Sequence, residues 1–442
     1  MRRSFLAVLL ITSLGVIATP AQSEVVSADT KMSLVKTITG NISPKSVRSS
    51  GSGLVSAHNM MYRHSVTIYD ANTFELVSTV PDSVQLSKYG YSKYSSIYKG
   101  SPVEGAYSPD GKYLYVTNYA MYGKGFNREG HDICSPASGY DTSFLYRVNL
   151  AKYEIDNVYP VGSVPKVVEV TPDNKFVLVS NWCSYDLTVI SIASQKVVKT
   201  IKIGRYPRGI AVSNDSKFAY VAEMGGNQIH VINLEDFSKT YIPIGSNPRA
   251  IVLSPDNKFV LVSNWCSYDL KVISIASQKV IKTIKIGRYP RGIAVSNDSK
   301  FAYVAEMGGS RIHVINLEDF SITYIPIGSN PRAIVLSPDN SMMYVTMNLS
   351  GKVASWDLIN NKAGKSVKTG KAARSLAISS DGTALFVVNF VSNTISKVRT
   401  SDMKVFQSIK ACNEPIGITY DSPTSRTWVA CYGGAIKIYD NK

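Results

Sequence analysis

The 442-residue sequence contains only 5 Cys, 5 His and 4 Trp, and its 32 acidic residues are outnumbered by 48 basic ones, which gives a formal net charge of +16. The low cysteine content excludes a small disulfide-dense scaffold, and a hydrophobic fraction of 44% excludes a disordered or collagen-like chain. The sequence also lacks a Gly-x-Ser-x-Gly nucleophile, a phosphate-binding P-loop and a dinucleotide-binding fingerprint followed by a helix. Because these motifs are absent, the protein can be an enzyme only if its active site is built from dispersed loop residues.

The one long apolar run lies at the N-terminus. Residues 1–3 are Met-Arg-Arg, residues 5–18 are mostly apolar, and residues 21–23 form a small-x-small cleavage site. Together they predict a signal peptide over residues 1–23, followed by one domain over residues 24–442. The run is too short for a membrane anchor, which needs about 20 apolar residues. We therefore expect the mature protein to be secreted or held at the cell surface or envelope, without a membrane span.

A long internal repeat organises the rest of the chain. Residues 172–254 recur as residues 255–337, at an offset of 83 residues and with five differences. The differences are Thr188/Lys271, Val198/Ile281, Asn227/Ser310, Gln228/Arg311 and Lys239/Ile322. Four of them alter polar positions and one exchanges Val for Ile, so the duplication has left the core residues unchanged.

A shorter period of about 41 residues runs through both copies and beyond them. Each unit opens with Gly-x-x-Pro or a close variant and contains four short strands rich in Val, Ile and Tyr, separated by turn residues. Four strands per period of this length are typical of a β-propeller blade. The units begin near residues 40, 100, 162, 204, 245, 287, 328, 370 and 411.

The last unit has only three strands, and residues 33–39 match the fourth strand of the other units. The sequence therefore predicts an all-β propeller of nine four-stranded antiparallel blades, in which the N-terminal strand completes the last blade and closes the ring. A smaller ring with one displaced unit is the alternative.

Several units carry a motif that points to a known family. Tyr115-Val116-Thr117-Asn118 follows a Ser-Pro-Asp-Gly-Lys turn, and other units read Ser-Pro-Asp-Asn-Lys-Phe-Val-Leu-Val-Ser-Asn. The chain thus resembles the YVTN family of secreted and surface β-propellers, which is related to the lactonase-type propellers. The resemblance covers nearly all of the mature chain and implies the fold, but its motif residues build blades and imply no activity. Because the family is usually seven-bladed, it also implies a seven-bladed ring enlarged by the duplicated two-blade segment.

Basic residues recur at one position of the repeat, directly after the Gly-x-x-Pro proline or at the matching place. They are Lys45, Lys166, Arg208, Arg249, Arg291, Arg332 and Arg374. Because equivalent positions surround the axis of a propeller, we expect these residues to form a basic collar near the mouth of the central channel. Such a collar favours carboxylate or phosphate ligands. The alternative is that its members pair with glutamates nearby, for which Glu169, Glu223 and Glu306 are the candidates.

Two long insertions, residues 81–99 and 119–142, are expected on the same face as the collar. The first is rich in Tyr, Lys and Ser, a composition that suits contact with a carbohydrate or polymer because tyrosine combines an apolar ring with a hydroxyl. The alternative is a mobile solvated loop. The predicted loop contacts are Tyr89, Tyr91, Tyr94, Tyr98, Trp182 and Trp265.

The predicted export and the positions of the cysteines in the repeat together predict two disulfides. Cys134 and Cys183 fall on loops of neighbouring units, and Cys412 and Cys431 fall within the last unit, so the expected pairs are Cys134–Cys183 and Cys412–Cys431. Cys266 is the duplicate of Cys183 and is either free or competes with it for Cys134. The five histidines show no spacing typical of a metal site, and no cofactor is expected.

These features predict an exported binding or interaction module whose partner is an anionic envelope polymer, a glycan or another protein. The alternative is a secreted lactonase-type hydrolase or isomerase, which requires two carboxylates, or a histidine with carboxylates, to converge at the channel mouth. Nucleic acid is not an expected partner, because an exported protein rarely meets it. The sequence does not set the oligomeric state.

Overall fold

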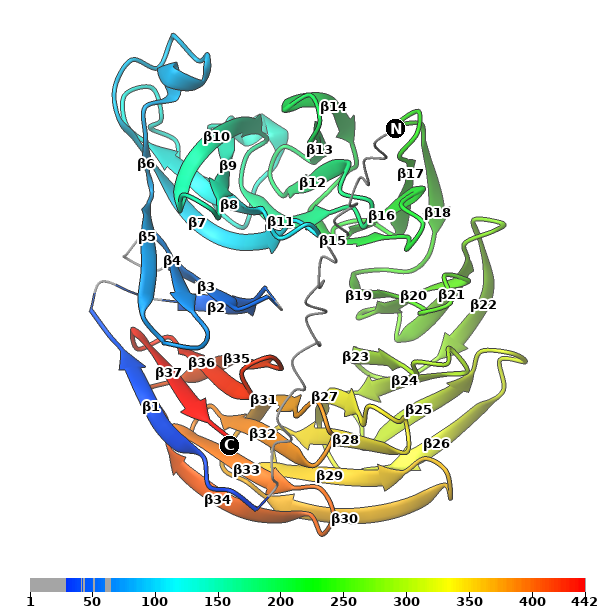
Figure 1. Ribbon diagram of the computed structural model, residues 1–442. Coiled ribbons are helices and arrows are strands. Elements are labelled where there is room, and N and C mark those ends of the chain that lie inside the picture. The colour runs from blue at the N-terminus through cyan, green and yellow to red at the C-terminus, as the bar shows by residue number, and fades with distance from the viewer. Residues whose placement is uncertain (1–28, 41, 43, 51, 60–64, 442) are drawn as a thin grey trace, which may run out of the picture.

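The computed structural model describes residues 29–40, 42, 44–50, 52–59 and 65–441, and the predicted signal peptide lies outside these ranges. The described residues form nine antiparallel sheets, which the chain builds one after another around a central axis (Figure 1). The prediction of an all-β propeller with nine blades is confirmed. The helices in the described part are the short 3-10 turns η1 (Leu86–Tyr89) and η2 (Pro136–Ser138), and neither is long and apolar enough to cross a membrane.

The first three blades carry both insertions. Blade 1 contains β2 (Pro44–Ser49), β3 (Leu54–Asn59), β4 (Ser65–Asp70) and β5 (Leu76–Pro81). Blade 2 contains β6 (Ser83–Val84), β7 (Tyr98–Tyr107), β8 (Tyr113–Tyr122), β9 (Ser143–Asn149) and β10 (Glu154–Val161). Blade 3 contains β11 (Pro165–Val170), β12 (Phe176–Asn181), β13 (Asp186–Ser191) and β14 (Lys196–Lys202). Part of the first insertion pairs as β6 with the start of β7, so blade 2 has a fifth strand that the repeat does not predict.

The next three blades show where the duplication falls in the fold. Blade 4 contains β15 (Pro207–Val212), β16 (Phe218–Glu223), β17 (Gln228–Asn233) and β18 (Lys239–Pro243). Blade 5 contains β19 (Pro248–Leu253), β20 (Phe259–Asn264), β21 (Asp269–Ser274) and β22 (Lys279–Lys285), and blade 6 contains β23 (Pro290–Val295), β24 (Phe301–Glu306), β25 (Arg311–Asn316) and β26 (Ile322–Pro326). The repeated segment corresponds to β12 through β19 and again to β20 through β27. Each copy therefore starts at the second strand of a blade.

The last three blades lead back to the N-terminal strand. Blade 7 contains β27 (Pro331–Leu336), β28 (Met342–Met347), β29 (Lys352–Asp357) and β30 (Lys362–Lys368), and blade 8 contains β31 (Ala373–Ile378), β32 (Ala384–Asn389), β33 (Thr394–Arg399) and β34 (Lys404–Lys410). Blade 9 contains β35 (Pro415–Asp421), β36 (Arg426–Cys431) and β37 (Ala435–Asp440). Its fourth strand is β1 (Ser33–Ile38), which pairs antiparallel with β37 as predicted.

The innermost strands establish that one ring contains all nine blades. They are β2, β7, β11, β15, β19, β23, β27, β31 and β35; each contacts the next, and β35 contacts β2. The alternative of a smaller ring with a displaced unit is therefore wrong. All nine innermost strands begin at the same face, which we call the entry face. The second strand of a blade ends at this face and the third begins there, so the second insertion opens on it.

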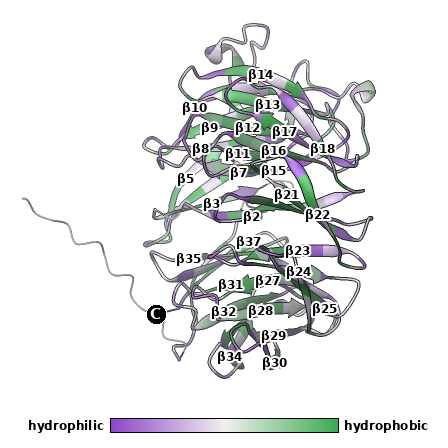
Figure 2. Ribbon diagram, turned by 90° about the vertical axis from the view of Figure 1, so that its right-hand side faces the viewer, coloured by the Kyte–Doolittle hydropathy of each residue, from purple (hydrophilic) through white to green (hydrophobic). Residues whose placement is uncertain are grey.

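Apolar packing between neighbouring blades forms the core. Leu178 and Leu187 of blade 3, for example, pack against Ala219 and Val221 of blade 4. Middle strands such as β12 and β20 are covered on both faces and are nearly continuous apolar runs, whereas the outermost strands are largely exposed. Seen from the side, the strands carry most of the hydrophobic residues (Figure 2).

A polar turn closes most blades at the face opposite the entry face. In blade 5 the hydroxyl of Ser254 donates to Asp256 at 2.6 Å and accepts the backbone N–H of Phe259 at 2.9 Å. Asn257 adopts a φ of 59°, the left-handed conformation that Asn and Gly tolerate best. In the equivalent turn of blade 6, the hydrogen bond from Ser296 lowers the pKa of Asp298. The Ser-Pro-Asp-Asn motif is thus explained by turn geometry alone.

Ring closure depends on contacts that β1 and the residues before it make. Thr30 donates to the carbonyl of Asn441 at 2.9 Å, Lys397 donates to the carbonyl of Thr30 at 2.8 Å, and Gln407 donates to the carbonyl of Met32 at 3.0 Å. These bonds attach the N-terminal segment to both blade 8 and blade 9. Without β1, the edge of β37 would be exposed.

We predict that deleting residues 1–39 destabilises the ring, whereas deleting residues 1–28 does not. Loss of the β1–β37 ladder, at about 1 kcal/mol for each hydrogen bond, should lower the free energy of unfolding by about 5 kcal/mol, and the exposed strand edge should promote self-association. Thermal unfolding and light scattering of the two variants measure both effects. Equal melting temperatures, with both variants monomeric, would contradict the closure role of β1.

Candidate functional site

The structure places the basic collar at the start of the innermost strands, on the entry face. Lys45 lies on β2, Lys166 on β11, Arg208 on β15, Arg249 on β19, Arg291 on β23, Arg332 on β27 and Arg374 on β31. The side chains of Lys45 and Arg249 lie outside the described part of the structure. Val103 on β7 and Ile416 on β35 interrupt the series. The position of the collar is therefore as predicted, whereas its ligand contacts stay a prediction.

Two members of the collar are engaged by neighbouring side chains. The ammonium of Lys166 lies 2.7 Å from Asp132 of the second insertion and 4.6 Å from the centre of the Tyr119 ring. Burial opposes ionisation of Asp132, but the hydrogen bond and charge of Lys166 outweigh it and lower the pKa of that carboxyl. Arg374 lies over the ring of Phe390, at 4.6 Å from its centre. These contacts attach Lys166 to the second insertion and Arg374 to the loop after β32.

Two other members line one cavity. Arg208 of blade 4 and Arg291 of blade 6 meet there with Met224 and Ala250, around a volume of about 250 Å³. Ala250 belongs to β19, the innermost strand between those of the two arginines, so its small side chain leaves room between them. No carboxylate in the described ranges forms an ion pair with Arg208, and neither a carboxylate nor an imidazole lines the cavity. Two arginines of the collar, from blades that are not adjacent, thus meet at one cavity.

The glutamates considered as collar partners have their own contacts within their blades. Glu223 lies 3.0 Å from the Nε2 atom of His230 and accepts the backbone N–H of Arg205 at 2.8 Å. Glu306 repeats this arrangement, with His313 at 3.3 Å. Burial lowers the pKa of His230, and the neighbouring Glu223 opposes that shift. These duplicated pairs fill the end of the second strand, where most other blades have Asn.

A different pair of glutamates lies on neighbouring innermost strands. Glu104 is on β7 and Glu169 on β11, and Arg48 is on β2. Burial raises the pKa of the Glu169 carboxyl, the positive charge of Arg48 opposes the shift, and the negative charge of Glu104 adds to it. Sequence reasoning treated Glu169 only as a partner for the collar. It missed Glu104, because the two residues occupy different positions of the repeat.

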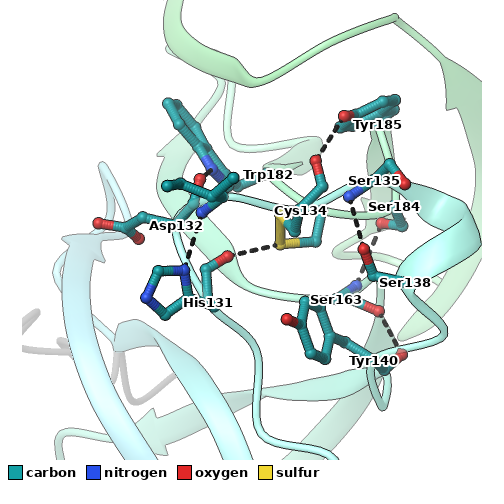
Figure 3. Close-up of a disulfide and its surroundings, with 12 residues drawn as sticks. His131, Asp132, Cys134, Ser135, Ser138, Tyr140, Ser163, Trp182, Ser184 and Tyr185 are labelled. Atoms are coloured by element: carbon teal, nitrogen blue, oxygen red, sulfur yellow. Dashed lines mark hydrogen bonds between the residues drawn. A yellow bond between two sulfur atoms is a disulfide. The ribbon is translucent and has the colours of Figure 1, made fainter.

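The second insertion is attached to blade 3 by the predicted disulfide Cys134–Cys183, whose Cα atoms are 5.4 Å apart (Figure 3). The indole N–H of Trp182 donates to the carbonyl of Asp132 at 2.9 Å, and the hydroxyl of Tyr185 donates to the carbonyl of Cys134 at 2.6 Å. Trp182 is 8% exposed as a result. The predicted contact residue Trp182 is therefore covered by the chain itself.

The remaining cysteines also follow the prediction. Cys412 and Cys431 form the second disulfide, with Cα atoms 6.0 Å apart. Cys266 is free and exposed, which decides between the two states that the sequence left open. Within the described part of the chain, no three His, Cys, Asp or Glu residues are grouped so that they could hold a metal ion.

The tyrosines of the first insertion divide into two groups. Tyr98 is buried, and Tyr94 stacks on Phe126 with ring centres 4.9 Å apart, so both belong to an apolar cluster of blade 2. Tyr89 and Tyr91 also pack against this cluster, but in addition they line a cavity of about 450 Å³ between the outer strands of blades 2 and 3. Of the tyrosines predicted as contacts in the first insertion, Tyr89 and Tyr91 therefore line a cavity, and their ligand contacts stay a prediction.

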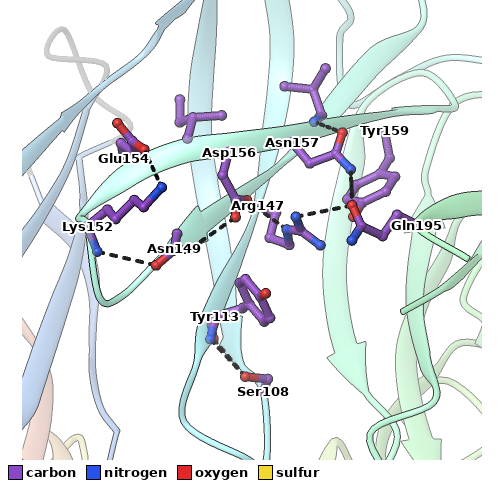
Figure 4. A network of polar contacts seen from close by, with 12 residues as sticks. Ser108, Tyr113, Arg147, Asn149, Lys152, Glu154, Asp156, Asn157, Tyr159 and Gln195 are labelled. Atoms are coloured by element: carbon purple, nitrogen blue, oxygen red, sulfur yellow. Dashed lines mark hydrogen bonds and ion pairs between the residues drawn. The ribbon is translucent and has the colours of Figure 1, made fainter. Parts of the chain in front are cut away.

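A polar network forms one wall of that outer cavity (Figure 4). Arg147 lies 2.7 Å from Asp156 and donates to Gln195 at 3.3 Å, and Asn157 donates to the same Gln195 oxygen at 3.2 Å. Gln195 belongs to the β13–β14 turn of blade 3, whereas Arg147, Asp156 and Asn157 belong to blade 2. The network therefore ties the two blades together at the outer rim, far along the strands from the collar.

Two family profiles support the propeller. A YNCE-like beta-propeller family profile matches residues 137–218, and the profile of a 7-bladed beta-propeller family named Lactonase matches residues 202–285. Hydrazine synthase of Kuenenia stuttgartiensis shares 23% identity, with a TM-score of 0.45 over 68% of this chain and 96% of that one. No curated protein sequence matches. The chain is thus similar to YNCE-like and lactonase-type β-propellers, and no specific function follows from that.

Sequence reasoning missed Met224 and Ala250 of the collar cavity. A signal for Ala250 was present, because the position two residues after the Gly-x-x-Pro proline is Gly, Ala or Ser in most units, as at Gly209 and Gly292. Small side chains there keep the approach to the arginines open. Met224 has a duplicate, Met307, whose sulfur lies 3.8 Å from a guanidinium nitrogen of Arg291.

We predict that the double variant Cys134→Ser/Cys183→Ser loses about 2–4 kcal/mol of unfolding free energy, since the disulfide closes a long loop. It should also increase the solvent exposure of Trp182, measurable by fluorescence quenching. Cys266→Ser is the matched control, because the same substitution at the exposed duplicate should change stability by less than about 0.5 kcal/mol. Equal denaturation midpoints for the two variants would contradict the anchoring role.

Proposed function

We propose that this protein is an exported β-propeller binding module that holds carboxylate or phosphate groups of an anionic polymer, glycan or protein at its entry face. The observation that carries the proposal is the cavity that Arg208 and Arg291 share. Two guanidinium groups around one small cavity suit bidentate hydrogen bonds to a planar or tetrahedral oxyanion. The excess of basic residues, to which the predicted signal peptide contributes only Arg2 and Arg3, adds long-range attraction for an acidic partner.

The duplication supports binding in preference to catalysis. Arg208 and Arg291 are duplicates of each other, and so are Met224 and Met307. Because the cavity spans both copies, it arises only when the two copies lie side by side in the ring. A contact surface gains from such enlargement, whereas a catalytic centre is disturbed by it.

Two further features support export of the protein. The disulfides Cys134–Cys183 and Cys412–Cys431 are typical of oxidising compartments. The resemblance of the repeat motifs to secreted and surface YVTN propellers points the same way. The partner would then be a component of the cell envelope or its surroundings.

The proposal predicts that Arg208→Ala/Arg291→Ala weakens binding of polyphosphate or polygalacturonate by about tenfold or more, because charge-assisted hydrogen bonds are lost. Binding by the unmodified protein should fall steeply as salt is added. Isothermal titration at two salt concentrations, with protein lacking residues 1–23, measures both effects.

The matched control is Lys199→Ala/Lys282→Ala, which removes two charges from the exposed outer strands β14 and β22. If this control weakens binding as much as the arginine variant, the attraction is general and the cavity is not the site. If neither polyanion binds, the charge argument fails.

A lactonase-type hydrolase is the second candidate. It is favoured by the Lactonase match over residues 202–285 and by the Glu104–Glu169 pair, which supplies two carboxylates on adjacent innermost strands. A carboxyl whose pKa is raised by burial is suited to general acid or base catalysis near neutral pH. The two proposals use different residues and can be tested separately.

This second candidate predicts hydrolysis of small δ-lactones with a kcat/KM that falls about 100-fold or more in Glu169→Gln. The pH profile of the unmodified protein should change above the usual carboxyl range, since the pKa of Glu169 is raised, and Glu169→Gln should lose that change. Glu235→Gln, at an exposed turn after β17, is the control. Absence of turnover, or equal activity of the two variants, would exclude Glu169 as a catalytic residue.

A further inference from the structure

The duplication has produced two copies of one loop in different surroundings. Asn181-Trp182-Cys183-Ser184-Tyr185-Asp186 of blade 3 recurs without change as Asn264-Trp265-Cys266-Ser267-Tyr268-Asp269 of blade 5. The first loop binds a segment of the second insertion. The second loop has the same residues but a different neighbour, so the first copy serves as a template for what the second can bind.

In the first copy, the bound segment is His131–Cys134, which is held by hydrogen bonds, a disulfide and an ion pair; Figure 3 shows the disulfide and its surroundings. The carbonyl of Asp132 accepts the indole N–H of Trp182, the sulfur of Cys134 is bonded to Cys183, and the carbonyl of Cys134 accepts the hydroxyl of Tyr185. The carboxylate of Asp132 pairs with Lys166 at 2.7 Å. The first loop, together with Lys166 on β11, thus recognises the pattern Asp-x-Cys through both backbone and side chains.

The second loop is built in the same way. The backbone N–H groups of Trp265 and Cys266 donate to Asn247 and Ser246, as those of Trp182 and Cys183 donate to Val164 and Ser163. Trp265 packs on Tyr289 with ring centres 4.9 Å apart, as Trp182 packs on Tyr206 at 4.6 Å. Arg249 occupies the repeat position of Lys166. The residues that contact the Asp-x-Cys segment in the first copy therefore have counterparts in the second copy.

The two loops differ in the segment that the preceding blade places over them. The blade before the first loop contributes the long insertion between β8 and β9, whereas the blade before the second loop contributes only the short turn between Glu223 and Gln228. Cys266 is exposed, Tyr268 is 37% exposed, and Trp265 is more exposed than Trp182. The duplication copied the receptor loop without copying the segment that it binds.

We propose that the loop Trp265–Tyr268 is a docking site for an extended Asp-x-Cys segment of a partner protein, bound as His131–Cys134 is bound to the first loop. The segment of this chain with that pattern is already joined to Cys183, and the same holds in any second copy. The occupant is therefore a different exported protein that presents a cysteine with an acidic residue two positions before it. This site is separate from the collar cavity and does not depend on anion binding there.

Attachment proceeds by thiol–disulfide exchange when the partner cysteine arrives in a disulfide. The thiolate of Cys266 attacks the partner sulfur, the old S–S bond breaks as the new one forms, and the displaced thiolate takes up a proton. One disulfide is consumed and one is formed, so no further oxidant is needed. Docking on the loop raises the local concentration of the partner disulfide and speeds this step.

The test uses a peptide with the sequence of residues 129–137, Glu-Gly-His-Asp-Ile-Cys-Ser-Pro-Ala, whose cysteine carries a 2-thiopyridyl disulfide. Release of thiopyridone gives the rate of exchange with Cys266 in the full mature protein, and mass spectrometry identifies the labelled cysteine. We expect this peptide to react about tenfold faster than a scrambled peptide of the same composition, which is the contribution of two ordinary hydrogen bonds. Cys266→Ser should abolish labelling.

Two variants separate docking from simple thiol reactivity. Tyr268→Phe removes one docking hydroxyl, and we expect it to slow the matching peptide several-fold while leaving the scrambled peptide unchanged. Tyr241→Phe, at a tyrosine that is 62% exposed on β18, is the matched control and should change neither rate. Equal rates for the two peptides, or equal rates for Tyr268→Phe and the unmodified protein, would overturn the proposal, as would a Cys266–Cys266 dimer as the main product.

Discussion

Every blade of this protein buries its apolar faces only against the blades on either side. Leu178 and Leu187 of blade 3, for example, share one buried cluster with Ala219 and Val221 of blade 4. No blade is therefore stable without both neighbours, and the ring must close. Closure rests on β1, whose pairing with β37 supplies the last sheet with its fourth strand. The dependence on closure also fixes the collar, because only a closed ring brings equivalent positions of nine strands around one axis.

Much of this architecture could be predicted from the sequence because it depends on local patterns. The period, the turn residues and the three-strand last unit are sufficient for nine blades and for the role of residues 33–39. The cysteine pairs could also be predicted, since Cys134 and Cys183 fall on adjacent loops at the same face. Those inferences need only the repeat phase of each residue.

The details of the candidate site depended on long-range contacts that no repeat encodes. Lys166 and Arg208 occupy the same position of their units, yet Lys166 is paired with Asp132 of an insertion, whereas Arg208 faces a cavity. The sequence predicts that Tyr98 lies in a loop, but the residue is buried in the core, because the insertion around it folds back onto blade 2. The interaction of Glu104 with Glu169 joins neighbouring strands at different repeat positions, which a single sequence does not reveal.

The phase of the duplication has a consequence for how such rings change in evolution. The copied segment begins at β12 and ends with β19, so each junction falls in a turn and the blades at the junctions combine strands from two sources. Recombination between the two copies would add or remove two blades at once and would leave every sheet with a complete set of strands. The number of blades can therefore change in steps of two without any intermediate that has an unpaired strand, and the loops at the entry face are multiplied or lost along with the blades that carry them.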